Sequence, residues 1–280
     1  MRLTVPVTIV LLMLSASAPA ASAAVEDESH VVVTLISEQS ALIPGKTAWL
    51  GIVLKHQPHW HTYWVNPGDS GLPTKLHWQL PPGFKAGDIA WPAPQRFTAG
   101  EVYNFGYAGQ VLLPVPIQIP AEAKPGTTAH LAVEAKWLVC REECIPGKAT
   151  LNMSLPITVA ASADRRWSKI FAGARAKLPQ PAAWSADAHL NGDRIEVVLR
   201  GTDLPPAAAL DAFTPQMRVL ACTAPQVSQD GNALHLSFAK NEYFDAPPAT
   251  LELVIVSGTP PQARSIIAPF AATPAISSKP

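Results

Sequence analysis

The chain has 280 residues, which is enough for two domains of ordinary size. Charged residues make up 15% of it, and its 29 prolines are about twice the usual share, so a fold built on long helices is disfavoured. The 21 Lys and Arg residues balance the 21 Asp and Glu residues, which leaves no basic field to attract phosphates. Nucleic acid is therefore not an expected partner.

The first 23 residues have the layout of a secretory signal. Arg2 supplies a positive start, residues 3–14 form an apolar run, and Ala21-Ser22-Ala23 offers small residues at a cleavage position. A membrane anchor is the alternative, but a run of about 12 residues is shorter than the ~20 that span a bilayer. We therefore expect a cleavable signal, no transmembrane segment in the mature chain, and an exported compartment in which disulfides persist.

Between residues 24 and 160, short runs of β-branched and aromatic residues alternate with Pro and Gly. The runs that predict strands cover residues 31–36, 47–55, 74–79, 111–119, 130–138 and 150–155. Breakers such as Pro44-Gly45 and Pro125-Gly126 end these runs, because Pro fixes φ and Gly permits positive φ. Strands at this spacing are typical of a β-sandwich, which predicts a first domain over residues 24–160.

One helix is expected between residues 163 and 178. Apolar residues recur there at steps of three and four, with Asp164 placed to cap the helix and Pro179 to end it. Further strands are predicted at residues 194–200, 218–222, 233–238 and 250–257, with a turn at Asp230-Gly231. The predicted class is all-β, with two β-sandwich domains joined by a helix-containing linker. The second domain is expected over residues 161–270, followed by a flexible tail over residues 271–280.

The chemistry of the sequence points to Cys140 and Cys144, which are separated by three residues. An apolar strand leads into Cys140, and the charged residues 141–143 form a tip before Cys144. Such a loop can bring two Cα atoms within the ~4.4–6.8 Å that a disulfide requires. A ring of about five residues adds only ~2 kcal/mol in the loop-entropy model. The spacing therefore favours a redox pair over a staple.

Other interpretations of the cysteines remain open. The pair could be a plain structural disulfide, whereas zinc is disfavoured because Cys-x3-Cys supplies only half of a four-ligand site. Arg141 lowers the pKa of a neighbouring thiol and Glu142 raises it, so the local charges do not decide which cysteine attacks. The third cysteine, Cys222, is expected to be a buried small hydrophobic residue or to form an intermolecular bond.

Three histidines, His56, His59 and His61, are candidate ligands for copper or zinc. On a strand His59 and His61 share one face, and His56 lies on the other. The alternative, which we favour, is that they are surface and half-buried residues beside an aromatic strand. Neither a metal nor a cofactor is therefore expected.

Three segments carry a resemblance to a known family. They are residues 60–73 (WHTYWVNPGDSGLP), 103–115 (YNFGYAGQVLLPV) and 137–148 (WLVCREECIPGK). In order and spacing they resemble the periplasmic N-terminal region of the DsbD family of thiol:disulfide interchange proteins. The nearer branch is the one called suppressor of copper sensitivity protein B. The resemblance covers most of the mature chain and is densest between residues 60 and 155.

The resemblance implies an immunoglobulin-like domain in the periplasm, acting as a component of a protein-disulfide reductase. Cys140 and Cys144 are the implied redox pair. It receives electrons from a membrane-embedded thiol donor and passes them to periplasmic thioredoxin-like or disulfide isomerase proteins. By analogy Cys144 is the sulfur that partners engage. An aromatic residue of a cap loop covers the disulfide in this family, and Phe97 and Tyr103 are the candidates for that role here.

The sequence departs from the full-length family pattern. Those proteins continue into a multi-helix membrane domain and a thioredoxin-like domain, whereas this chain stops at Pro280. We therefore expect either a separate electron donor or a fragment of a larger protein. The alternative function is a non-catalytic periplasmic β-sandwich module, for copper handling or assembly, whose disulfide is only structural.

Overall fold

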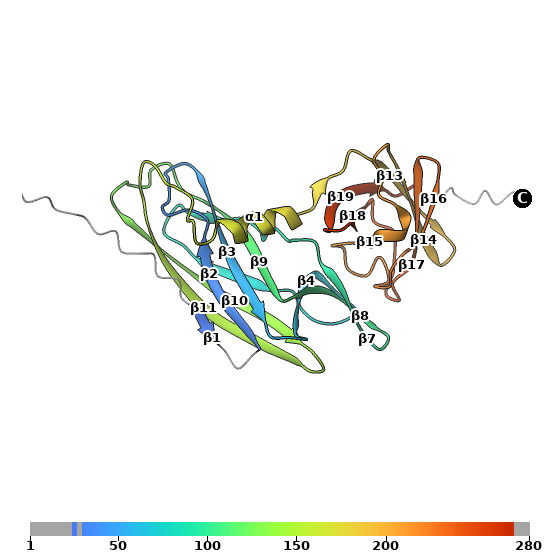
Figure 1. The fold of residues 1–280 in the computed structure, drawn as a ribbon, viewed down its shortest axis with the longest axis horizontal. Coiled ribbons are helices and arrows are strands. Elements are labelled where there is room, and N and C mark those ends of the chain that lie inside the picture. Colours follow the sequence, from blue (N-terminus) through green and yellow to red (C-terminus); the bar gives the residue numbers. More distant parts are fainter. Residues whose placement is uncertain (1–23, 27–29, 272–280) are drawn as a thin grey trace, which may run out of the picture.

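Two β-sandwiches follow one another in the computed structural model, and helix α1 (Ser168–Lys177) leads from the first to the second (Figure 1). The structure describes residues 24–26 and 30–271. The predicted signal over residues 1–23 and nearly all of the predicted tail lie outside the described residues. The predicted class, all-β with two immunoglobulin-like sandwiches and a helix-containing linker, is confirmed.

The first sandwich consists of two sheets. One has the order β1-β2-β3-β9-β6, with strands β1 (Ala24–Glu26), β2 (Val31–Ser37), β3 (Thr47–His56), β9 (Gln110–Gln118) and β6 (Lys85–Ala86). The other has the order β11-β10-β4-β8-β7, with strands β11 (Cys144–Pro156), β10 (Thr128–Cys140), β4 (His61–Gly68), β8 (Val102–Ala108) and β7 (Gln95–Ala99). A short strand, β5 (Lys75–Gln79), also pairs with β10. This second sheet carries the candidate site.

Alternation of apolar and polar residues explains the long hairpin of β10 and β11. In β11 the side chains of Leu151, Met153 and Leu155 are buried, while the residues between them are exposed. Strand β3 is apolar almost throughout, because one of its faces lies on the sandwich core and the other lies under α1. A strand that is covered on both faces loses the alternating pattern.

Helix α1 begins later than the sequence predicts. Residues 163–167 form a turn in which the amide of Trp167 donates to the carbonyl of Asp164. The Asp164 carboxylate accepts the backbone amide of Arg166 and pairs with its guanidinium, so it caps this turn and not the helix that starts at Ser168, where the prediction had placed it. The predicted apolar face is present: Phe171 and Ala174 are buried. They pack in a cluster with Ile36, Val53 and Leu112.

The second sandwich also has two sheets. One has the order β12-β19-β18-β15, with strands β12 (Gln180–Pro181), β19 (Gln262–Pro269), β18 (Thr250–Ser257) and β15 (Leu210–Phe213). The other has the order β13-β14-β17-β16, with strands β13 (Ser185–Asn191), β14 (Arg194–Arg200), β17 (Ala233–Ala239) and β16 (Gln226–Asp230). A single turn of 3-10 helix covers Ala207–Ala209. The predicted strand over residues 218–222 is absent, because this segment makes only an isolated bridge between Leu220 and Lys240.

The two sandwiches share apolar contacts. The core cluster of the first sandwich includes Phe213 of the second, whose ring meets the ring of Phe105 edge to face at 5.1 Å. Cys222 belongs to the same cluster and is 4% exposed. Its predicted burial is therefore correct, and the residue lies at the junction of the sandwiches. Within residues 24–26 and 30–271, no helix has the length and apolar character needed to cross a membrane.

Candidate redox site

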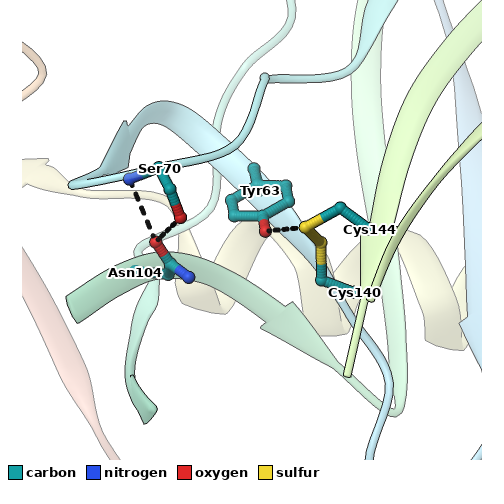
Figure 2. The surroundings of a disulfide bond; sticks show 5 residues. All are labelled: Tyr63, Ser70, Asn104, Cys140 and Cys144. Atoms are coloured by element: carbon teal, nitrogen blue, oxygen red, sulfur yellow. Dashed lines mark hydrogen bonds between the residues drawn. A yellow bond between two sulfur atoms is a disulfide. The ribbon is translucent and has the colours of Figure 1, made fainter. Parts of the chain in front are cut away.

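Cys140 and Cys144 form a disulfide at the end of the β10–β11 hairpin (Figure 2). They are the last register pair of the two strands, and their Cα atoms are 4.3 Å apart. Residues 141–143 form the tip, where the amide of Arg141 donates to the carbonyl of Glu143. The antiparallel ladder therefore brings the two cysteines together, as the spacing predicts.

The two halves of the disulfide have different environments. Cys140 is 4% exposed, whereas Cys144 is exposed. The reason lies in the sheet order: Cys140 is on the inner strand β10, where it pairs with His61 of β4, and Cys144 begins the edge strand β11. Directly opposite residues of an antiparallel pair have neighbouring side chains on one face. His61 is therefore the cross-strand neighbour of Cys140.

A tyrosine hydroxyl lies against the exposed half of the disulfide. The Oη atom of Tyr63 is 3.4 Å from Sγ of Cys144 (Figure 2). A disulfide sulfur carries no proton, so the hydroxyl donates. Tyr63 is fully buried, and burial raises the pKa of its hydroxyl above the ordinary value. The hydroxyl therefore keeps its proton and remains a donor at neutral pH.

The position of Tyr63 depends on a loop that only glycine permits. Gly71 has a φ of +98°, and a Cβ added there would lie 2.2 Å from Cε1 of the Tyr63 ring. Backbone bridging between Tyr63 and Pro73 fixes the same loop. The side chains of Ser70 and Asn104 are hydrogen bonded at 3.0 Å and tie the loop to β8 (Figure 2). The last residues of β4 and the turn after them, residues 66–74 and called the 66–74 loop below, thus hold the phenol ring in place.

The two cap candidates lie on the hairpin of β7 and β8. Phe97 of β7 is half-buried and stacks on His61, with ring centroids 4.5 Å apart and an interplanar angle of 11°. Tyr103 of β8 pairs with Thr98, and its amide donates to the carboxylate of Asp69 at 2.8 Å. The structure therefore places Phe97 over the neighbour of Cys140, and it places the backbone of Tyr103 beside the 66–74 loop.

The three histidines do not converge on one point. His56 is buried: Nδ1 bonds the Gly109 carbonyl at 2.8 Å, and Nε2 bonds the Thr62 hydroxyl at 2.9 Å. Burial lowers the pKa of His56 to about 4. His59 is exposed in a left-handed turn with φ of 72°. Among the described residues no group of three or more His, Cys, Asp or Glu side chains is placed to hold a metal ion.

The sequence alone indicated no chemical role for Tyr63, and His61 was considered only as a candidate metal ligand. The signal that could have placed them is their alternation along one strand, since residues i and i+2 lie on the same face. His61 and Tyr63 indeed contact each other edge to face, at 5.3 Å between ring centroids. Burial lowers the pKa of His61, so its imidazole is neutral at pH 7. Its Nε2 atom is buried and has no hydrogen-bond partner within the described part of the chain.

Comparisons with known proteins agree with this geometry. The family described as "Thiol:disulfide interchange protein DsbD, N-terminal" matches residues 32–156. The crystal structure of the N-terminal periplasmic domain of ScsB from Proteus mirabilis has the same fold, with a TM-score of 0.68 and 17% sequence identity. The match covers 92% of this chain and 100% of that one. Comparison with curated protein sequences finds no match. Over 92% of its length the chain thus has the fold of that periplasmic domain, and its residues 32–156 are similar to the N-terminal domain of DsbD proteins.

Proposed function

We propose that the chain is a periplasmic thiol-disulfide exchange module in which Cys140 and Cys144 relay reducing equivalents. The electrons come from a membrane-embedded thiol protein and pass to periplasmic thioredoxin-like or disulfide isomerase proteins, in keeping with the family of residues 32–156. One observation carries the proposal. The disulfide has one buried and one exposed half, at a hairpin tip beside a tyrosine hydroxyl.

A purely structural role explains this bond poorly. The cysteines are four positions apart, and closing so small a ring adds only ~2 kcal/mol in the loop-entropy model. The ladder already joins β10 and β11 through 13 register pairs. A disulfide that adds little stability and exposes one sulfur is suited to being opened and re-formed.

The exposed sulfur determines the order of the exchange. In the loading direction a donor thiolate attacks Sγ of Cys144, the S–S bond breaks, and Cys140 leaves as a thiolate. A second donor thiol resolves the mixed disulfide and leaves both cysteines reduced. In the delivery direction the Cys144 thiolate attacks a substrate disulfide, and Cys140 then attacks Cys144 and expels the second substrate thiol. Loading brings two electrons and two protons to the cysteine pair. Delivery passes them to the substrate and restores the Cys140–Cys144 bond.

The neighbouring side chains suit these steps. The Tyr63 hydroxyl donates to Cys144 in the disulfide, and a hydrogen bond to the thiolate stabilises the attacking sulfur. The neutral imidazole of His61 is the cross-strand neighbour of Cys140, and its buried Nε2 has no hydrogen-bond partner among the described residues, so it is suited to accept the proton of that thiol. Both side chains lower the barrier to exchange.

Equilibration with glutathione buffers tests the proposal. We expect the wild-type disulfide to have a potential above about −300 mV, since structural disulfides generally lie below this value. The Cys140→Ser variant should accumulate a mixed disulfide of glutathione with Cys144. The matched Cys144→Ser variant should not, because its remaining thiol is buried. Mass spectrometry of the alkylated protein measures both. A potential well below −300 mV, or equal labelling of the two variants, would instead support a structural disulfide.

A further inference from the structure

Strand β7 joins the candidate site to the second sandwich. Its consecutive residues Arg96 and Phe97 point to opposite faces of the strand. Phe97 stacks on His61, beside Cys140. Arg96 points the other way and contacts the second sandwich. Because one peptide unit joins them, a displacement of Arg96 also displaces Phe97.

The contacts of Arg96 are extensive. Its guanidinium binds both carboxylate oxygens of Asp211, at 2.6 Å through Nη2 and at 3.3 Å through Nε. It also donates to the carbonyls of Ala212, at 3.2 Å, and of Cys222. The same group lies over the rings of Phe105 and Phe213, 4.9 and 5.0 Å from their centroids. The Arg96 side chain is 12% exposed and that of Asp211 is 32% exposed, so this bidentate pair is partly shielded from solvent and stronger than a fully exposed ion pair.

The second segment over the site is tied in the same way. Asn66, at the start of the 66–74 loop, donates through Nδ2 to the carbonyl of Thr214 at 2.9 Å. The carboxylate of Asp69 in that loop acts on the Cys222 thiol. Burial first, and this carboxylate second, raise the pKa of Cys222 to about 12, so the thiol keeps its proton and the contact is neutral on the sulfur side. Both segments around the disulfide therefore have anchors in the second sandwich.

Apart from these anchors, β7 has few contacts that fix its position. It is the edge strand of its sheet and pairs only with β8 among the described strands. The turn at the end of β7 contains Gly100, with φ of +63° and no atom within 4 Å of an added Cβ. Segments with one ladder partner and few tertiary contacts open at low free-energy cost. The position of Phe97 over the site thus depends on Arg96.

We propose that the second sandwich is a brace that keeps Phe97 stacked on His61 beside Cys140, and that Arg96 is the positioning residue through which it acts. This inference rests on the proposed function, because it concerns access to the same cysteine pair. It gives the second sandwich a role in exchange although that domain contributes no side chain to the disulfide. Opening of the disulfide moves Cys140 against the His61–Phe97 stack that Arg96 holds, so the brace sets how easily the bond is opened.

The rate at which dithiothreitol reduces the oxidised full-length chain tests the brace. Substitution of either partner, as Arg96→Gln or Asp211→Asn, should speed reduction by about 2- to 30-fold, the range of coupling between linked sites. Phe97→Ala should give a similar gain. Arg96→Lys should give a smaller gain than Arg96→Gln, because it keeps the charge but loses the bidentate pairing. The control is Arg200→Gln, which breaks an exposed ion pair with Asp187 inside the second sandwich and should leave the rate unchanged.

The double variant Arg96→Gln/Phe97→Ala decides the mechanism. If Arg96 acts through Phe97, the double variant is reduced no faster than Phe97→Ala alone. If the two gains multiply, if Phe97→Ala has no effect, or if Asp211→Asn leaves the rate unchanged, the brace is wrong. Unfolding in urea, measured in parallel, separates access from lost stability, since general destabilisation would persist in the Phe97→Ala background. Dithiothreitol needs no protein partner, so failure here leaves the relay itself standing.

Discussion

At the scale of single residues, the Tyr63 hydroxyl is the group that most directly affects the chemistry of Cys144. In Tyr63→Phe the ring keeps its packing but the thiolate loses a hydrogen bond worth ~1.5–3 kcal/mol. We therefore expect the pKa of the Cys144 thiol to rise by about one to two units. The pH dependence of iodoacetamide alkylation in the Cys140→Ser background measures this pKa. Cys222 does not interfere, because it is buried and protonated.

Tyr107 provides the matched control for that experiment. It is also buried, and its hydroxyl donates to the carbonyl of Pro92 at 2.7 Å, away from the disulfide. Tyr107→Phe should cost about 1 kcal/mol of stability and leave the Cys144 pKa unchanged. If the pKa of the Cys144 thiol is the same in Tyr63→Phe and in the parent, Tyr63 is only a packing residue.

Some residues of the site could be predicted from the sequence, and others could not. The Cys140–Cys144 pairing follows from a spacing of three residues and a strand that leads into it. The roles of Tyr63 and His61 do not follow, because their side chains meet the cysteines across 81 residues of sequence in one case and through strand register in the other. A pattern along the chain cannot state which strands become neighbours.

At the scale of elements, the end of the β10–β11 hairpin depends on a close contact between Trp137 and Gly147. These residues are register partners, and a Cβ on Gly147 would lie 2.2 Å from the indole ring. Trp137 is 4% exposed and cannot move without disturbing the core. Gly147→Ala should therefore cost about 1–3 kcal/mol of unfolding free energy in urea, as overpacking does.

Gly173 provides the opposite case on α1. A Cβ there meets no atom within 4 Å, and alanine is the better helix former. Gly173→Ala should therefore stabilise the chain by up to about 1 kcal/mol. If Gly147→Ala and Gly173→Ala change the unfolding free energy alike, the contact of Gly147 with Trp137 does not determine the stability of the hairpin end.

Elements with a clear pattern were predicted well, and the others were missed for physical reasons. Strands β2, β3, β9, β10 and β11 carry β-branched or alternating residues, and each was expected. Strands β4 and β8 were not, because Asn and Gly interrupt their patterns, and β7 was not, because its five residues include one large apolar side chain, Phe97. In these strands tertiary pairing overrides local preference. The helix start was misplaced because the Asp164 carboxylate caps a separate turn, through the amide of Arg166, before the helix begins at Ser168.

At the scale of the whole molecule, the shared core predicts that the two sandwiches unfold together. Phe213 is 2% exposed and packs against Trp64 and Phe105 of the first sandwich. Removing a buried Phe side chain costs about 3–5 kcal/mol. Calorimetry should show one transition for the parent chain and two for Phe213→Ala. Ile267→Ala, at a site on β19 that is 61% exposed, should keep a single transition. A split transition in the parent would contradict this account.

The contact between the sandwiches had no signature in the sequence. Arg96 and Asp211 lie 115 residues apart, and each is an ordinary charged residue in its own surroundings. Burial of the pair depends on how two finished domains pack, which hydrophobic periodicity does not encode. The count of two sandwiches was predictable from strand spacing, whereas their junction was visible only in three dimensions.

The register of the long hairpin has a kinetic consequence. Its ladder holds Cys140 opposite Cys144 whether or not the sulfurs are bonded, because the other register pairs do not depend on the disulfide. The second thiol therefore acts at a high effective molarity on any adduct formed at the first. A mixed disulfide on Cys144 is short-lived as a result, and a partner leaves the domain soon after its own bond has been reduced.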